Sequence, residues 1–330
     1  MVWKRWFRDR GSSSVHPLDV VAALLTCRAK LFSKGWGNEQ FLSDLTKYTS
    51  FSSLGMGPIS ITWDGSKGNG SAIAVRDGCY SSPFAILPVG ASTVHIRGLL
   101  KTGNRAACVI LAASRDEGYS ARERVFGALA NYGVDVYLLE NPFYGQRRIT
   151  RSASLETFSD HVLMNLASVW EARSLLQQLR GLYAKLAVAG YSMGGHMAAI
   201  TAATAPFSLA CAPLATGASA APIYTEGLLS WSVDLKALAG KQGSESTANR
   251  RLRTLIEMAD LTQFSPPLRS DAAVIVGCRR DGYISASEIL RLHQHWPNST
   301  LRWLSAGHVT GVIRYGSALR SAVSDALEKL

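Results

Sequence analysis

A serine stands between two glycines in Gly190-Tyr191-Ser192-Met193-Gly194, and its surroundings constrain the fold more than any other segment. The small, apolar run Leu186-Ala187-Val188-Ala189 precedes the pentapeptide, and Gly195-His196-Met197-Ala198-Ala199-Ile200 follows it with the composition of a helix. A Gly-x-Ser-x-Gly motif alone arises by chance, but here it has the strand, tight turn and helix that a nucleophilic serine requires. Side chains at both glycine positions would collide with neighbouring backbone. We therefore predict that Ser192 is a nucleophile, with a plain turn serine as the alternative.

Apolar strands alternate with amphipathic helices on both sides of this turn. Strands are predicted at 108–112, 134–139, 186–189, 208–213, 272–277 and 300–304, and helices at 120–132, 154–182, 195–203, 285–296 and 315–330. Such alternation is typical of a parallel sheet that helices cover on both faces. Together with the serine turn, it predicts an α/β-hydrolase fold with a mostly parallel central sheet.

We expect one hydrolase domain over residues 58–330, after a basic, helical extension over residues 1–57. The extension has helical spacing at 16–34. Residues 58–100 alternate short β-prone runs, such as 84–89, with Gly, Ser and Pro, which predicts antiparallel strands at one edge of the sheet.

One stretch, at about 220–264, interrupts the alternation of strands and helices. Its sequence is mostly helical, and it follows a late strand, where an insertion is a natural lid over an active site. The alternative is a helical pair that only pads the edge of the sheet.

A serine hydroxyl needs a histidine as its base, and that histidine needs a carboxylate to orient it. In this fold the order along the chain is serine, acid, histidine, each after a strand. His308 follows the last predicted strand, and Asp281 follows the strand at 272–277, with a chain-turning role as its alternative. Glu288 and Asp234 are the fallback candidates for the acid. The remaining histidines are predicted to have structural roles: His16, His95, His161, His196, His293 and His295.

An oxyanion hole requires two aligned hydrogen-bond donors. The backbone N–H of Met193 is the first, because it opens the helix after Ser192. The second is expected in the loop 113–118, after the strand at 108–112, where we favour the backbone of Ser114. The chemistry requires no cofactor and no metal.

The chain carries 35 Lys and Arg against 24 Asp and Glu, a formal net charge of +11. This balance favours an anionic partner, such as an acidic membrane or a phosphorylated substrate, or reflects only a basic surface. Nucleic-acid binding has no recognised module in its support, so we predict none. The five cysteines are isolated, which suggests neither a zinc site nor a redox motif and favours a reducing compartment.

Residues 2–8 bring Trp3, Trp6 and Phe7 together with Lys4, Arg5 and Arg8. This pattern is typical of a mitochondrial transit peptide or a membrane-surface helix, and a disordered, uninvolved N-terminus is the alternative. No apolar run approaches the roughly 18 residues that a bilayer-spanning helix needs. We expect an intracellular protein, mitochondrial or peripheral to an anionic membrane.

Several segments resemble one family, the α/β-hydrolase domain-containing protein 18 family. They are residues 30–37, Leu139-Glu140-Asn141-Pro142-Phe143-Tyr144-Gly145, residues 192–198, and the neighbourhoods of Asp281 and Gly307-His308. The likeness spans most of the chain. It implies a Ser192, Asp281 and His308 triad and an intracellular acyl hydrolase, with a mitochondrial phospholipid such as cardiolipin as a candidate substrate.

The sequence departs from the family pattern at one loop. Members carry Ala-Gly-Thr-Gly-Asp where this chain has Ala112-Ala113-Ser114-Arg115-Asp116, so both glycines are absent. This change puts the second oxyanion donor in doubt and keeps a second hypothesis open, a pseudo-hydrolase that binds a lipid or protein without turnover.

The segment 141–148 follows a strand and should lie at the rim of the site. Tyr144, Arg147 and Arg148 are candidate ligands of a substrate phosphate, because guanidinium groups bind phosphate in a bidentate manner. A turn whose arginines are only solvated is the alternative. The leading hypothesis is therefore hydrolysis of a carboxylic ester, with a lipid or another ester as substrate, through an acyl-Ser192 intermediate.

Overall fold

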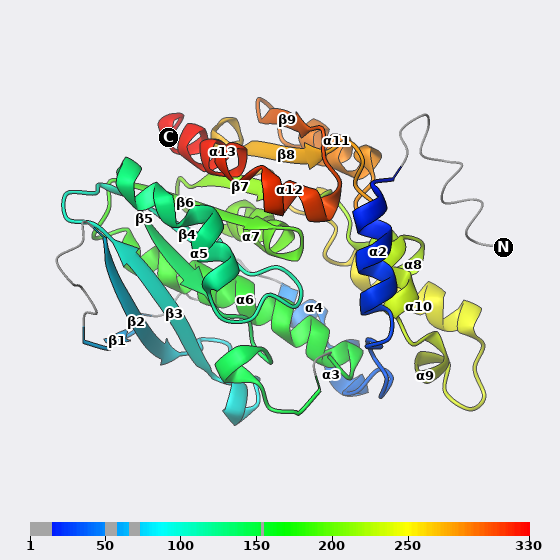
Figure 1. The fold of residues 1–330 in the computed structure, drawn as a ribbon. Helices are drawn as coiled ribbons and strands as arrows, with labels where there is room; N and C mark the ends of the chain where they lie inside the picture. Colours follow the sequence, from blue (N-terminus) through cyan, green and yellow to red (C-terminus); the bar gives the residue numbers. More distant parts are fainter. Residues whose placement is uncertain (1–14, 50–57, 66–72, 153–154) are drawn as a thin grey trace.

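The fold is that of a computed structural model, which describes residues 15–49, 58–65, 73–152 and 155–330. Nine strands form one sheet in the order β1-β2-β3-β5-β4-β6-β7-β8-β9 (Figure 1). Their bounds are β1 Thr62–Trp63, β2 Ala74–Ser81, β3 Thr93–Leu100, β4 Ala106–Leu111, β5 Val134–Leu139, β6 Lys185–Tyr191, β7 Ala210–Leu214, β8 Val274–Cys278 and β9 Thr300–Leu304. Strands β4 to β9 pair in parallel, whereas β1, β2 and β3 pair antiparallel with each other and β3 pairs antiparallel with β5.

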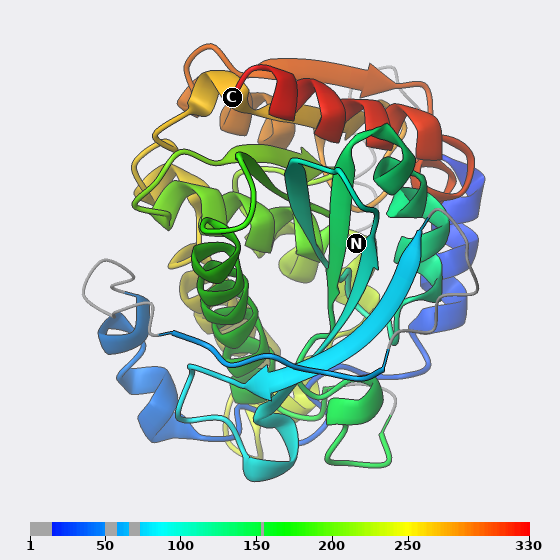
Figure 2. The same cartoon turned by 90° about the vertical axis from the view of Figure 1, so that its left-hand side faces the viewer.

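Helices cover both faces of the sheet. One face holds α5 (Ser120–Phe126) and α13 (Gly316–Glu328), and the other holds α6 (Phe158–Leu179), α7 (Met193–Thr204) and α11 (Ala286–His295). Figure 2 shows the sheet between these layers, with β9 (orange, top) and β3 (cyan, bottom) toward its opposite ends. The central strands β4 and β5 are buried along nearly their whole length, which explains why they form continuous apolar runs in the sequence.

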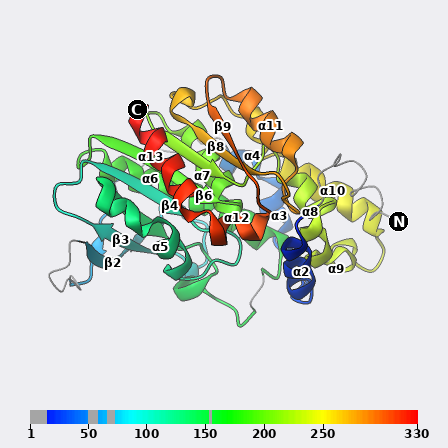
Figure 3. The same ribbon diagram turned by 45° about the horizontal axis from the view of Figure 1, so that its top comes forward.

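The remaining helices are short. They are α2 (Pro17–Thr26), α3 (Glu39–Ser43), α4 (Thr46–Thr49), α8 (Ala221–Thr225), α9 (Leu235–Ala239), α10 (Glu245–Glu257) and α12 (His308–Arg314), with 3-10 turns at Val89–Ala91, Gly127–Tyr132, Gly145–Arg147, Leu228–Ser232, Leu261–Gln263 and Ser270–Ala272. Figures 1 and 3 both show α2 (blue) beside α12 and the segment that carries α8. Helix α2 thus packs directly on segments from the second half of the chain.

The predicted elements agree with the structure except at two places. The strand predicted at 84–89 is absent, because Pro83 precedes this stretch, Pro88 lies within it, and Phe84 packs into the core instead. The helix predicted at 16–34 ends at Thr26. Beyond it, Leu31 N donates to Ser232 O and Phe32 N to Leu155 O, so distant backbone partners replace the next helical turns.

Candidate active site

Ser192 lies in the turn between β6 and α7 with a φ of 57° and a ψ of −121°. A residue other than glycine rarely adopts a positive φ, and such strain is typical of the turn that presents a nucleophile. Ser192 N donates to Leu214 O on β7 at 2.8 Å, and His196 N donates to Ser192 O at 3.0 Å. Hydrogen bonds on both sides therefore hold the turn.

Gly190 and Gly194 leave the space that this turn needs. A Cβ at Gly190 would lie 2.3 Å from the carbonyl carbon of Gly194, and a Cβ at Gly194 would lie 2.4 Å from Leu111 O on β4. Both neighbours are backbone atoms, so no side-chain rotation relieves the clash. The predicted requirement for glycine at both positions is confirmed.

His308 and Asp281 are in direct contact, with 2.7 Å between His308 Nδ1 and Asp281 Oδ2. The other carboxylate oxygen, Oδ1, accepts hydrogen bonds from the backbone N–H groups of Tyr283 at 2.7 Å and Ile284 at 2.8 Å. Burial lowers the pKa of His308. The charge and hydrogen bond of Asp281, together with the charge of Asp19, raise it by more, so the pKa of His308 lies above its usual value. Asp281 therefore both orients the ring and stabilises its protonated form.

Tyr191 connects the serine turn to His308. Its hydroxyl donates to His308 O at 2.6 Å, and the two ring centroids are 5.2 Å apart. Among the described residues, no hydrogen bond joins Ser192 Oγ to the His308 ring. Bonds of this kind are often long before a substrate binds. The structure thus joins Asp281 to His308 and places Ser192 next to the tyrosine that contacts His308.

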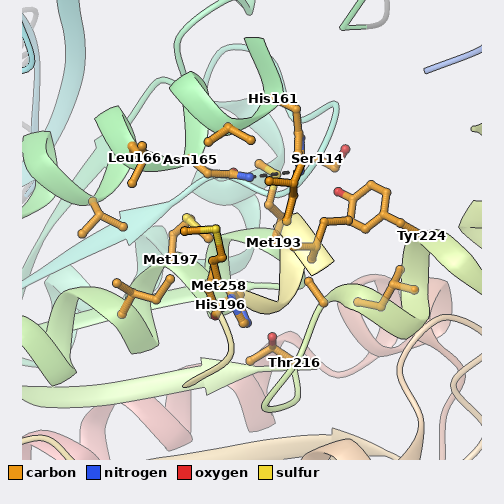
Figure 4. A pocket seen from close by; sticks show the side chains of 18 of the residues that line it. Ser114, His161, Asn165, Leu166, Met193, His196, Met197, Thr216, Tyr224 and Met258 are labelled. Atoms are coloured by element: carbon orange, nitrogen blue, oxygen red, sulfur yellow. Dashed lines mark hydrogen bonds between the residues drawn. The ribbon is translucent and has the colours of Figure 1, made fainter. Parts of the chain in front are cut away.

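The loop after β4 faces the serine turn. Ser114 and Met193 line the same cavity as Ser192, which is where the two predicted oxyanion donors should lie (Figure 4). Arg115, in place of a family glycine, has a φ of 64°, and its Nη2 donates to Ala29 O at 2.9 Å. The loop is therefore anchored to the segment after α2, and the donor roles stay predictions.

Arg147 is completely buried and is used inside the protein. Its Nη1 and Nη2 donate to the two Glu171 carboxylate oxygens at 2.8 and 2.6 Å. The remaining N–H groups donate to Glu140 O and, twice, to Ala91 O, so all five have acceptors. The structure contradicts the prediction that Arg147 binds a substrate phosphate, because a buried guanidinium needs internal partners for its charge.

The other two predicted phosphate ligands differ from each other in exposure. Tyr144 is buried, which raises the pKa of its hydroxyl despite contacts with Ser114 and Arg115 that act in the opposite direction. It therefore packs behind the loop that carries Ser114. The Arg148 side chain is 25% exposed and donates to the Glu117 carboxylate. Arg148 alone of the three stays a predicted substrate contact.

The fallback residues lie elsewhere. Glu288 accepts a hydrogen bond from Ser219 N at 2.9 Å, and Asp234 caps α9 through Ala237 N at 3.0 Å, so neither contacts His308. Four of the other histidines form hydrogen bonds outside the Asp281–His308 pair: His16 with Leu18 N, His196 with Ala259 O, His293 with Ser299, and His295 with Phe264 O. This agrees with the structural roles predicted for them.

Residues 29–249 and 239–329 match the sequence profile of the family described as alpha/beta hydrolase domain containing 18. The chain belongs to this family. Among solved structures, it is similar to acetyl xylan esterase 1 from a Thermoanaerobacterium species, with a TM-score of 0.59 and 13% identity over 93% of this chain and 98% of that chain. It is also similar to an acetyl xylan esterase from a Paenibacillus species, with a TM-score of 0.55 and 11% identity over 89% of this chain and 98% of that chain. At these identities the likeness shows the fold, which is the α/β-hydrolase fold.

Ser192 is one of the residues that line a cavity of about 120 Å³. Figure 4 shows this cavity from close by. Its walls are mostly aliphatic and thioether side chains from α6, α7, α8 and α10, among them Leu166, Val169, Met197, Ile200, Ile223 and Leu255. The volume is close to the roughly 150 Å³ that encloses a benzene-sized hydrocarbon. The cavity is thus suited to an apolar group next to the serine.

One polar pair lines this cavity. His161 Nε2 lies 3.1 Å from Asn165 Nδ2, the contact drawn as a dashed line in Figure 4. Burial lowers the pKa of His161 to about 4, so its ring is neutral at physiological pH. The pair therefore adds polarity to the cavity but no charge.

The insertion at 220–264 forms one wall of the cavity. Ile223 of α8, Leu255 and Ile256 of α10, and Met258 just after α10 all line it. The segment therefore contributes to the lining of the candidate site, and its role as a lid stays a prediction.

Two functional features escaped the sequence analysis. Glu140, within the family motif, is buried and accepts hydrogen bonds from Gly118 N and Gln146 N, both at 3.2 Å, so it links the loops after β4 and β5. Asp19 of α2 bonds to the loops that carry Asp281 and His308. A buried carboxylate has no distinct sequence signal, although the family motif marked Glu140.

Two features are absent from the part of the chain that the structure describes. None of the helices there has the length and apolar character that crossing a membrane requires. The same residues contain no group of three or more His, Cys, Asp or Glu side chains placed to hold a metal ion.

Proposed function

We propose that the protein is a serine-dependent hydrolase of carboxylic esters. Ser192 Oγ attacks the ester carbonyl while His308 Nε2 takes its proton, and Asp281 holds the ring through Nδ1. The backbone N–H groups of Met193 and Ser114 stabilise the oxyanion. His308 then protonates the leaving alcohol, and water, deprotonated by the same ring, releases the acyl group from Ser192. The observation that carries this proposal is the Asp281–His308 contact next to the strained Ser192 turn.

A fluorophosphonate probe tests the nucleophile directly. Wild-type protein is expected to be labelled, whereas Ser192→Ala is expected to lose labelling and to lower kcat by about 10⁴- to 10⁶-fold. The variant should keep the melting temperature of the wild type, because it removes one hydroxyl from the surface of a cavity. Equal labelling of both proteins would refute the assignment of Ser192.

As substrate we propose a lipid ester with an anionic head group. The aliphatic cavity supports the first few carbons of an acyl chain next to Ser192, and the net charge of +11 together with Arg148 supports an anionic group outside it. Cardiolipin is the phospholipid that the family resemblance implies. Hydrolysis of cardiolipin, phosphatidylcholine and a short acetyl ester should be compared, with Ser192→Ala as the blank. Faster turnover of the acetyl ester than of both lipids would contradict this substrate class.

Peripheral contact with an anionic membrane is a further part of the proposal. The outer face of α2 exposes Leu18 by 47%, Val21 by 48%, Leu24 by 51% and Leu25 by 72%. These positions lie within about 120° of one another on a helix of 3.6 residues per turn, so they form one apolar stripe. Apolar stripes with cations nearby, here the exposed Arg28, are typical of helices that lie in a membrane interface.

Liposome sedimentation tests this contact. Val21→Ser combined with Leu25→Ser is expected to weaken binding to vesicles that contain an anionic phospholipid, and salt should weaken the binding of the wild type. Leu182→Ser is the matched control, because Leu182 is 70% exposed elsewhere on the surface. Binding indifferent to lipid charge, to salt and to the α2 substitutions would contradict it. A mitochondrial location rests on residues 2–8, which lie outside the described residues, and subcellular fractionation checks it.

A pseudo-hydrolase is the second candidate function. Its support is the loop that lacks both family glycines and, within the described residues, the missing hydrogen bond between Ser192 and His308. Esterase activity that His308→Ala abolishes would eliminate this candidate, whereas lipid binding without turnover would favour it over the hydrolase.

A further inference from the structure

Asp19 is a buried carboxylate that forms no ion pair with any of the described residues. Its side chain lies in the first turn of α2 and is 0% exposed. Carboxylates are almost never fully buried unless their charge is balanced. Among the described residues, no Lys, Arg or His lies within ion-pair distance of Asp19. The charge must therefore be stabilised by other groups.

Three backbone N–H groups surround the Asp19 carboxylate. Oδ2 accepts hydrogen bonds from Gly282 N at 2.8 Å and His308 N at 2.7 Å, and Oδ1 accepts one from Val309 N at 2.9 Å. Gly282 directly follows Asp281, and Val309 directly follows His308. One carboxylate thus bonds to both loops that present the proposed acid and base.

Asp19 also caps α12. This helix begins at His308, and the residue before it, Gly307, has no side chain that could accept the first N–H groups. Such groups need an acceptor, and residues with side-chain oxygens usually supply it locally. Here Asp19 supplies it from a position 289 residues earlier in the chain.

Glycines on both loops make room for this approach. A Cβ at Gly307 would lie 2.8 Å from Asp19 Oδ2 and 2.4 Å from His16 Cβ, and a Cβ at Gly282 would lie 2.9 Å from Asp19 Cβ. The start of α2 is fixed to the Asp281 loop once more, because His16 N donates to Arg280 O at 2.9 Å. Helix α2 and the two loops therefore form one packed unit.

We propose that Asp19 is a positioning residue, whose carboxylate holds the Asp281 loop and the His308 loop in the relative placement that proton transfer at His308 requires. The inference rests on the proposed function, in which these two residues are the acid and the base. It adds that α2, at the far end of the sequence, belongs to the catalytic framework.

The charge of Asp19 also acts on His308. The titratable groups around the His308 ring and its backbone are Asp281, Asp19, Tyr191, Tyr283, Cys278 and His16. Burial raises the pKa of Tyr283 and that of Cys278 to about 12 each, and raises that of Tyr191 well above its usual value, so these three are neutral at physiological pH. Asp281 and Asp19 supply the negative charge that raises the pKa of His308.

The test compares Asp19→Asn with Asp135→Asn. Asp135 is a matched control: it is buried at the opposite end of the strands and also accepts three hydrogen bonds, from Lys101 N, Asn104 and Tyr183. Asp19→Asn is expected to lower kcat by about ten- to hundredfold with KM changed less than about threefold, because misplaced catalytic groups slow the chemical step. It should also move the acid limb of the pH profile to lower pH. Asp135→Asn should lower the melting temperature only.

A second variant covers the case in which Asp19→Asn does not fold. Gly307→Ala keeps the Asp19 side chain but sets a methyl group against its carboxylate and against His16 Cβ, and it should lower kcat in the same manner. Where both variants fold, the double variant should be no slower than the slower single variant, because both substitutions break one contact. Unchanged kcat in Gly307→Ala, or fully additive losses in the double variant, would overturn the inference.

A measurement independent of turnover separates this inference from the proposed function. An NMR titration of the His308 ring should show a lower pKa in Asp19→Asn than in the wild type and no change in Asp135→Asn. That result supports the inference even if neither wild type nor variant hydrolyses an ester, which would refute only the proposed function. An unchanged His308 pKa together with an unchanged kcat would make Asp19 a purely structural residue and overturn the inference.

Discussion

The Ser192 turn lies between two sets of loops that the protein holds in place by different means. On one side are the loops after β4 and β5, which carry Ser114 and the family motif. On the other side are the loops after β8 and β9, which carry Asp281 and His308. Both sets must be fixed to a fraction of an ångström for the proposed chemistry.

The β4 and β5 loops are held mainly by charges buried within their own half of the molecule, with one further contact from Arg115 Nη2 to Ala29 O in the segment after α2. Glu140 accepts hydrogen bonds from Gly118 N and Gln146 N, and the Arg147–Glu171 pair fixes the loop after β5 to α6. The β8 and β9 loops both donate hydrogen bonds to Asp19, which α2 brings from the start of the described chain. In the first arrangement, displacing a loop would leave a buried charge unpaired and so lower the stability of the whole fold. In the second, the placement of the proposed pair Asp281 and His308 would depend on one helix.

The largest expected effect is that of Arg147→Met. It leaves the Glu171 carboxylate, which is fully buried, without its partner, and breaking a buried pair in this way costs about 3–5 kcal/mol of the free energy of unfolding. Chemical denaturation checks this value. A side chain that bound substrate phosphate would show the opposite pattern, a raised KM at unchanged stability.

Arg148→Met is the matched control for that experiment. Arg148 follows Arg147 in the chain, but its ion pair with Glu117 is partly exposed, and such pairs contribute only about 0–1 kcal/mol. We expect near-normal stability and a raised KM for an anionic lipid. Equal losses of stability in both variants would remove the distinction between the internal and the surface arginine.

Gly145→Ala should have an intermediate effect. Gly145 has a φ of 52°, and a Cβ there would lie 1.9 Å from Glu140 Oε1. The carboxylate would have to move away from Gly118 N, so we expect a loss of about 1–3 kcal/mol in the free energy of unfolding, as for other overpacked sites. Gly133→Ala is the control, because Gly133 also has a positive φ, 85°, but nothing lies near its missing Cβ. If both variants lost the same stability, the Glu140 contact would contribute nothing.

The same contrast explains what the sequence could predict. The serine turn could be predicted because the glycines, the strand and the helix that shape it are consecutive in the sequence. The order of Ser192, Asp281 and His308 was readable because parallel strands all end at one edge of the sheet. Strands β5 and β9 have the bounds that their apolar runs predict.

What could not be predicted depends on distant partners. Arg147 and Arg148 are equivalent in sequence, and only the fold shows that Glu171 of α6 lies next to the first. Asp19 precedes an apolar run, and nothing in the sequence indicates that Gly282 N and His308 N donate hydrogen bonds to it. Residues 27–34 have helical spacing, but their backbone bonds to Ser232 and Leu155 instead. In each case the deciding contact joins residues far apart along the chain.

The smallest expected effect, a displacement in pH, distinguishes the two sets of loops by the charge each presents at the site. His161, which lines the cavity on the side of α6, has its pKa lowered to about 4 by burial, so it is neutral over the working range. His308, on the other side, has its pKa raised by Asp281 and Asp19 after burial has lowered it. Since only neutral His308 accepts the serine proton, kcat/KM should rise with pH through a midpoint above 6.5, the usual value for histidine.

Stability should change in the opposite direction over that range. A histidine whose pKa is raised in the folded state stabilises the fold fully below its unfolded pKa of about 6.5, and this contribution is lost as pH rises through the folded value. The melting temperature of wild type relative to His308→Gln should therefore decline while kcat/KM increases. Asp281→Asn should move the activity midpoint to lower pH, and His161→Gln should leave it unchanged. The proposed mechanism would be contradicted if the midpoint of the kcat/KM profile lay below pH 6.5. It would also be contradicted if His161→Gln, and not Asp281→Asn, displaced that midpoint.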